Sequence, residues 1–94
     1  MIGTFQQTVL ISVAVLEGRG DAAAVIAEVE RRLGRAVPRG AVHITLQRLE
    51  GKRLICSRSA TRRRRHYRIE AAGLRALSAA KAEVEKAWKD VSLS

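Results

Sequence analysis

Apolar residues recur at intervals of three and four positions along much of this chain, which is the period of one face of an α-helix. On this basis we predict four helices, at about residues 4–17, 22–33, 38–51 and 71–90. The first is apolar nearly all round, so we expect it to be buried on two sides, the second of them against another subunit.

Residues with known capping preferences mark the ends of these helices. Thr4 and Gln7 have the spacing of a capping box at the start of the first helix. Asp21 is placed to cap the second helix and Gly34 to end it. Pro38 is tolerated at the first position of the third helix. Two helices joined by a short turn that contains glycine are typical of a helix-turn-helix.

Two short strands are predicted after the third helix, at about 53–58 and 64–69. In the second strand, Tyr67 and Ile69 fall on one face, which we expect to meet the core. Residues 59–63 form the expected hairpin tip. A helix-turn-helix followed by a basic hairpin predicts a winged helix-turn-helix, a mainly α fold of the α+β kind, with residues 1–70 as its DNA-binding domain.

The last predicted helix carries a heptad pattern. Its members are Leu74, Leu77, Lys81, Val84, Trp88 and Val91. A terminal helix has no obvious partner left in so small a domain, so we interpret residues 71–94 as a dimerisation helix packed on the same domain. In a dimer, Trp88 either lines a slot for a small, planar, hydrophobic effector or fills the dimer core. The sequence leaves both interpretations open.

The positive charge is confined to one segment. Residues 39–68 hold ten basic residues and a single acid, Glu50, whereas the other 64 residues hold eight basic and eight acidic ones. A protein that is neutral apart from one strongly basic segment has the charge distribution of a phosphate-binding surface.

One face of the third helix has the residues for DNA recognition. A helical projection separates Val42, Thr45, Leu46 and Leu49 from an outward face that comprises Arg39, Gly40, His43, Ile44 and Gln47. In a helix-turn-helix this face enters the major groove. Gln47 has the groups for a bidentate bond to adenine, and Ile44 suits a thymine methyl. A merely solvated face is the alternative, but an isoleucine fits it poorly.

Four consecutive arginines follow in the predicted wing: Arg62, Arg63, Arg64 and Arg65. Alone, such a run is also compatible with a solvated sheet edge, a localisation signal or an RNA-binding patch. Its place directly after the recognition helix favours contacts with the DNA backbone or the minor groove.

The composition excludes several other classes of protein. The longest apolar run is far shorter than the ~20 residues of a membrane span, so no membrane association is predicted. The single Cys56 cannot form an internal disulfide, which favours a cytoplasmic protein, and we expect it to be a small buried residue of a strand. His43 and His66 lack the carboxylate partner or ligand spacing needed for phosphodiester cleavage, so we predict neither an enzyme nor a cofactor or metal.

Taken with their order in the chain, these motifs resemble the PadR family of bacterial transcriptional regulators. The similarity is strongest over residues 40–55 and 62–69 and extends to residues 4–16 and Gly73. It implies a homodimeric winged-helix repressor that dimerises through its C-terminal helix and often responds to a small molecule. Family members usually have tyrosine in place of His43, a Tyr-Gly pair in place of part of Ala22–Ala24, and a Thr-Pro pair in place of Glu70-Ala71.

The sequence therefore predicts a homodimeric, sequence-specific DNA-binding regulator, a repressor of a promoter that carries a pseudo-palindromic operator in double-stranded DNA. Its release by a small hydrophobic effector or another signal is part of this expectation. Two alternatives use the same basic face: a protein-interaction module with an acidic partner, and a nucleic-acid-binding protein without sequence preference.

Overall fold

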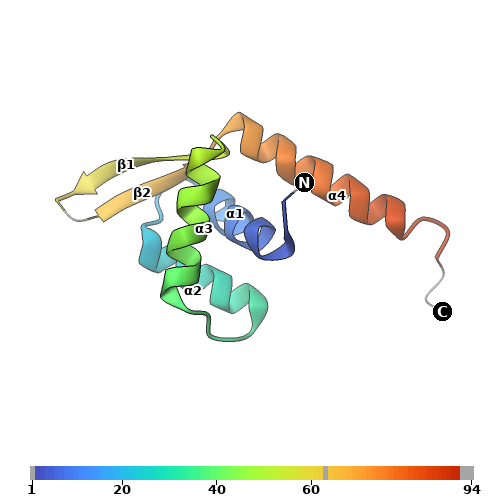
Figure 1. The fold of residues 1–94 in the computed structure, drawn as a ribbon, viewed down its shortest axis with the longest axis horizontal. Coiled ribbons are helices and arrows are strands. Elements are labelled where there is room, and N and C mark those ends of the chain that lie inside the picture. The colour runs from blue at the N-terminus through green and yellow to red at the C-terminus, as the bar shows by residue number, and fades with distance from the viewer. Residues whose placement is uncertain (1, 63, 92–94) are drawn as a thin grey trace.

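A computed structural model describes residues 2–62 and 64–91 of the chain. The order of elements is α1 (Thr4–Val15), α2 (Ala22–Leu33), α3 (Arg39–Gly51), β1 (Ile55–Thr61), β2 (Arg64–Ile69) and α4 (Ala71–Ala87). The first three helices form the body, from which the β1–β2 hairpin projects on one side and α4 on the other (Figure 1). This is the predicted winged helix-turn-helix, mainly helical with a hairpin wing. Arg63, for which the sequence predicts a contact with DNA, lies outside the described residues.

Helix α2 has the predicted limits because each of its capping residues bonds a backbone group only three or four positions away. Asp21 accepts a hydrogen bond from the Ala24 backbone N–H at 2.9 Å, which satisfies one of the free donors of the first turn. At the other end Gly34 adopts the left-handed conformation, with φ of 69°, and its N–H bonds the Glu30 carbonyl. Together these residues stop the helix at both ends.

The predicted start of α1 at residue 4 is confirmed but its predicted cap is wrong, and α3 begins one residue later than predicted. Gly3 is the N-cap of α1 and Thr4 is already helical, while the side-chain amide of Gln7 donates to the Ile2 carbonyl at 3.1 Å, so no capping box forms. In α3, Pro38 is the N-cap, with ψ of 131°, and Arg39 is the first helical residue.

Strand β1 begins and ends later than predicted, whereas β2 has its predicted limits. Arg53 has a φ of 60° and belongs to the turn that follows α3, so β1 begins at Ile55. The strands pair antiparallel, from Ile55 opposite Ile69 to Thr61 opposite Arg64, with an irregularity between Ser59 and Thr61. Residues 59–61 are therefore part of a strand, so the prediction that they belong to the hairpin tip was wrong, whereas Arg62 lies in the turn as predicted.

The core is aliphatic. Its buried members come from the three body helices, the turn before α3 and the first residue of β1: Val9, Leu10, Val13, Val25, Ile26, Val29, Val37, Val42, Leu46, Leu49 and Ile55. Tyr67 and Ile69 of the wing are half-buried and pack against this cluster, as predicted. Cys56 is only half-buried on β1, which corrects the expectation of a buried residue.

Helix α4 is partly packed on its own domain. Ala76 and Leu77 are half-buried against the core cluster, so the expectation that the seam has no partner within the domain was wrong at Leu77. Leu74, Val84 and Trp88 are each 55% exposed. The helix ends at Ala87, with Trp88 as its C-cap, so Val91 lies beyond it. No helix of the described part of the chain is long and apolar enough to cross a membrane.

Gly73 fixes the distance between α4 and the turn before β1. A Cβ at this buried glycine would lie 2.2 Å from the Leu54 carbonyl oxygen and 2.7 Å from Ile69 Cγ1. We therefore expect Gly73→Ala to lower the free energy of unfolding by about 1–3 kcal/mol, measured by denaturant titration. Gly51→Ala is the matched control, since nothing lies within 4 Å of its Cβ position. Equal stability of the two variants would contradict this packing.

Candidate nucleic-acid interface

Helix α3 has one buried face and one exposed face, as the sequence predicted. Val42, Thr45, Leu46 and Leu49 are buried against the body, and the Thr45 hydroxyl donates to the Ala41 carbonyl at 2.8 Å. The side chains predicted to touch DNA all lie on the exposed face: Arg39, Gly40, His43, Ile44 and Gln47. Ile44 is 51% exposed. Burial of the opposite face holds this exposed face, which we term the recognition face for its predicted role, in a fixed orientation.

Two arginines of the wing, Arg64 and Arg65, have defined partners. Arg64 Nε lies 3.7 Å from Asp21 Oδ2, and Arg65 Nε donates to Ser57 Oγ at 2.9 Å. Arg62 is exposed in the turn between the strands. Because Asp21 caps α2, its ion pair with Arg64 connects the wing to the helix-turn-helix.

Glu50, the only acid between residues 39 and 68, is engaged in this network. Ser57 donates its hydroxyl proton to Glu50 Oε2 at 2.7 Å and accepts the bond from Arg65. The chain Arg65–Ser57–Glu50 thus joins β2, β1 and the last turn of α3. It places the negative charge of Glu50 in a hydrogen-bonded network between the helix and the wing.

A hollow of about 270 Å³ lies where α2, α3 and β2 meet. Its lining includes Ala22 and Ala23 from the first turn of α2, His43 from α3, and Arg64 and Arg65 from β2. Asp21 and Tyr67 complete it. Burial raises the pKa of the Tyr67 hydroxyl, and the negative charge of Glu50 raises it further. The tyrosine is therefore a neutral hydrogen-bonding group at ordinary pH.

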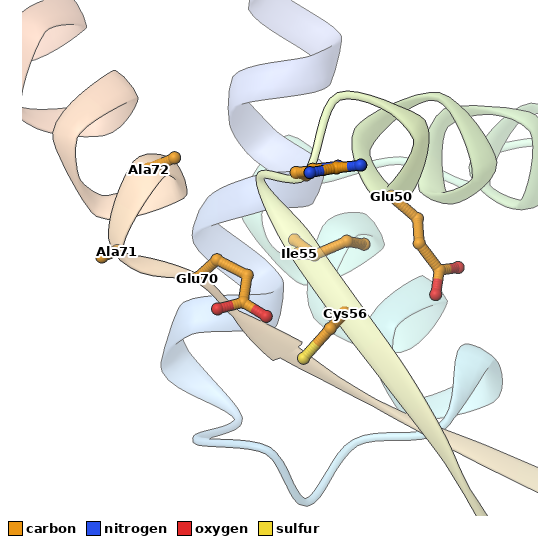
Figure 2. A pocket seen from close by; sticks show the side chains of 7 residues that line it. Glu50, Ile55, Cys56, Glu70, Ala71 and Ala72 are labelled. Atoms are coloured by element: carbon orange, nitrogen blue, oxygen red, sulfur yellow. The ribbon is translucent and has the colours of Figure 1, made fainter.

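A second hollow, of about 420 Å³, is lined by residues from the start of β1 and the start of α4, and it contains a thiol. Cys56 and the carboxylate of Glu70 point into it (Figure 2). The Glu70 carboxylate, as acceptor for the thiol proton, raises the pKa of Cys56, and burial adds to the effect. A thiol held in its protonated form is a poor nucleophile. The described residues also contain no group of three histidine, cysteine, aspartate or glutamate side chains placed to hold a metal ion.

The raised pKa of Cys56 gives a test with a definite sign. At pH 7 less thiolate is present than in a free cysteine, so we expect slower alkylation by iodoacetamide. Glu70→Gln removes the negative charge, lowers the pKa of Cys56 and should increase the rate measured by mass spectrometry. Glu83→Gln, on the exposed part of α4, is the control. An unchanged rate in Glu70→Gln would show that Glu70 does not control the thiol.

Trp88 lies at the surface of the single chain, at the C-terminal end of α4. A ligand slot between two copies of Trp88 therefore stays a prediction.

Sequence reasoning placed the exposed face of α3 and the wing, but it missed the residues that connect them. Asp21 was predicted only as a helix cap, and Ser57 was not singled out. The one available signal was the isolation of Glu50 in a basic segment, which suggests that its charge has a structural partner. Which partner it has depends on the pairing of β1 with β2.

No protein-family model matches the sequence, and neither does any curated protein sequence. Solved structures do match it. RosR of H. salinarum has a TM-score of 0.78 at 19% identity, over 97% of this chain and 81% of RosR. The chain has the winged helix-turn-helix fold.

Two further structures support the assignment of the fold. MepR of S. aureus, solved in a complex with DNA, has a TM-score of 0.68 at 20% identity, over 94% of this chain and 68% of MepR. BpsR of Bordetella bronchiseptica, whose DNA binding is regulated by 6-hydroxynicotinic acid, has a TM-score of 0.66 at 13% identity, over 98% of this chain and 64% of BpsR. Membership of the PadR family stays a prediction.

Proposed function

We propose that this chain is a homodimeric, sequence-specific DNA-binding transcriptional regulator of the PadR type, acting as a repressor. The observation that carries the proposal is the recognition face of α3 beside a wing of arginines. Base-reading groups such as Gln47 and Ile44 are exposed on a helix whose opposite face is buried. The single acid of this segment is bonded to Ser57 between helix and wing. The complex of MepR with DNA supports the same use of the fold.

The proposed dimer rests on α4. Leu74, Val84 and Trp88 form an exposed apolar stripe on a helix that projects from the body (Figure 1). A second copy of α4 would bury this stripe through its heptad spacing. The two recognition helices would then enter successive major grooves about 34 Å apart on a pseudo-palindromic operator.

Release by a small hydrophobic effector forms the regulatory part of the proposal. Its support is the exposed Trp88 on the proposed dimer stripe, together with the regulation of BpsR by an aromatic acid. Paired indole rings in a dimer would present flat apolar surfaces to a planar ligand.

Selection of bound duplexes from a random DNA pool, at ~150 mM salt, tests the function because salt at that level suppresses purely electrostatic binding. We expect enrichment of an inverted repeat with half-sites about one helical turn apart. Binding without enrichment would favour a sequence-independent nucleic-acid-binding protein. Absence of DNA binding would favour a module that docks an acidic protein.

A further inference from the structure

The hollow between α2, α3 and β2 brings three basic side chains together from two elements. His43 comes from the recognition helix, whereas Arg64 and Arg65 come from the wing. The first turn of α2 adds Ala22 and Ala23, and backbone N–H groups at this position of a helix have no partner within the helix. Cationic side chains around one hollow, beside the first turn of a helix, are the chemistry that recognises a phosphate group.

Each of the two arginines has a polar partner before any ligand binds. The Asp21 carboxylate lies 3.7 Å from Arg64, and Ser57, itself bonded to Glu50, accepts from Arg65. Side chains that are already ordered lose less conformational entropy on binding. The acid at the hollow is also engaged, because Asp21 accepts the Ala24 N–H with one oxygen and faces Arg64 with the other.

Four titratable or charged groups line the hollow with His43. Asp21 comes from the start of α2, and Arg64, Arg65 and Tyr67 come from β2. Tyr67 is neutral at ordinary pH because its pKa is raised, and Asp21 is compensated by Arg64. Of the groups at the hollow, histidine is the one whose residue type ordinarily titrates between pH 5 and 8. A phosphate placed there would favour its protonated form.

We propose that this hollow is a phosphate-binding site that takes one backbone phosphate of bound DNA, and that His43 contacts this phosphate as an imidazolium. The inference rests on the proposed function and changes one part of it, because His43 then contacts the backbone instead of a base edge. It has a consequence for regulation: the complex holds more protons than its free components. DNA affinity therefore rises as the pH falls through the range in which histidine titrates.

The test is the dissociation constant for a DNA duplex, measured by fluorescence anisotropy from pH 5.5 to 8.5 at constant ionic strength. For the unchanged protein we expect weaker binding at high pH, by about tenfold if DNA shifts the titration by one pH unit. His43→Gln should bind with little dependence on pH. His66→Gln is the matched control, because His66 lies on β2 opposite Arg58 and away from this hollow, and should keep the dependence.

Two results of this titration would overturn the inference. One is an affinity that is independent of pH in the unchanged protein. The other is a dependence that survives in His43→Gln. His43 is exposed, so its replacement should leave the fold intact, and thermal unfolding followed by circular dichroism checks this.

NMR distinguishes a hollow that takes free inorganic phosphate from one that takes only the phosphates of DNA. Inorganic phosphate is added to the DNA-free protein at constant ionic strength, and amide shifts are followed at Ala22, Ala23 and His43. Shifts that are lost in His43→Gln show that the hollow also takes free phosphate. Shifts at the hollow with DNA alone assign it to the DNA backbone. The absence of shifts there with either ligand contradicts the site.

Failure of this inference is distinguishable from failure of the proposed function. If DNA selection finds an operator but His43→Gln keeps the full pH dependence, the regulator stands and the phosphate site fails. If selection finds no preferred sequence but binding depends on His43 and pH, the phosphate site stands and sequence-specific regulation fails.

Discussion

Replacing Gln47 by alanine is expected to remove discrimination at one base position of the operator. Gln47 is exposed on the recognition face of α3, and a bidentate amide contact to adenine contributes about 1–3 kcal/mol of discrimination. This corresponds to roughly 5- to 150-fold in relative affinity. The measurement is competition between the preferred duplex and duplexes with one substituted base pair. Alanine favours a helix, so the fold should be unaffected.

The wing supplies a contrasting variant for the same experiment. Arg62→Ala should weaken binding to all duplexes alike and reduce the slope of affinity against salt by about one. Arg75→Ala removes the same charge from an exposed position on α4, at a distance from the wing, and serves as its control. If Gln47→Ala left the preferred sequence unchanged, the reading face would be wrongly assigned.

Val84→Glu is expected to convert the dimer into a monomer and to cost more DNA affinity than any single contact. Val84 is 55% exposed, so the charge does not disturb the core of the single chain. In a dimer, the same charge would lie in the apolar stripe between two α4 helices. Loss of the second half-site should reduce affinity by about 10²–10⁴-fold, because linked binding makes the second contact intramolecular.

Analytical ultracentrifugation and anisotropy measure the two parts of this result. Ala82→Glu introduces the same charge at an exposed position of α4 outside the stripe, and should leave the dimer and its DNA affinity intact. A Val84→Glu variant that remains dimeric would place the dimer interface elsewhere.

The local elements of this fold are predictable because their signals are local. Asp21 and Gly34 end α2 through bonds to residues three or four positions away, and both act as predicted. The failure at Thr4 has a physical reason of the same kind. Gly3 caps α1, and the Gln7 side chain bonds the Ile2 carbonyl instead of completing a box.

Elements that depend on distant partners were predicted less well. The limits of β1 are set by its pairing with β2, which extends through small polar residues that read as a loop in sequence. Leu77 has the spacing of a dimer seam, yet it packs on the domain's own core, because the first part of α4 lies against the body. Heptad spacing alone does not reveal which helix surface is already covered.

The exposed face of α3 followed from helical periodicity, but the phosphate hollow did not. His43 and Arg64 are 21 positions apart. They line one hollow because β2 lies beside the start of α2. A bridge between Gly20 and Tyr67 holds the two segments together. Pairing of this kind carries no periodic signal, so the hollow could not be predicted from the sequence.

Sequence-specific recognition of DNA by this chain is tested by the ratio of two affinities. The dissociation constants for the duplex obtained by selection and for a scrambled duplex are measured at ~150 mM salt. We predict at least about 10³-fold tighter binding to the selected duplex, the lower range of specific regulators. A ratio near one would contradict sequence-specific recognition and would leave the basic surface as a binder of nucleic-acid phosphates without sequence preference.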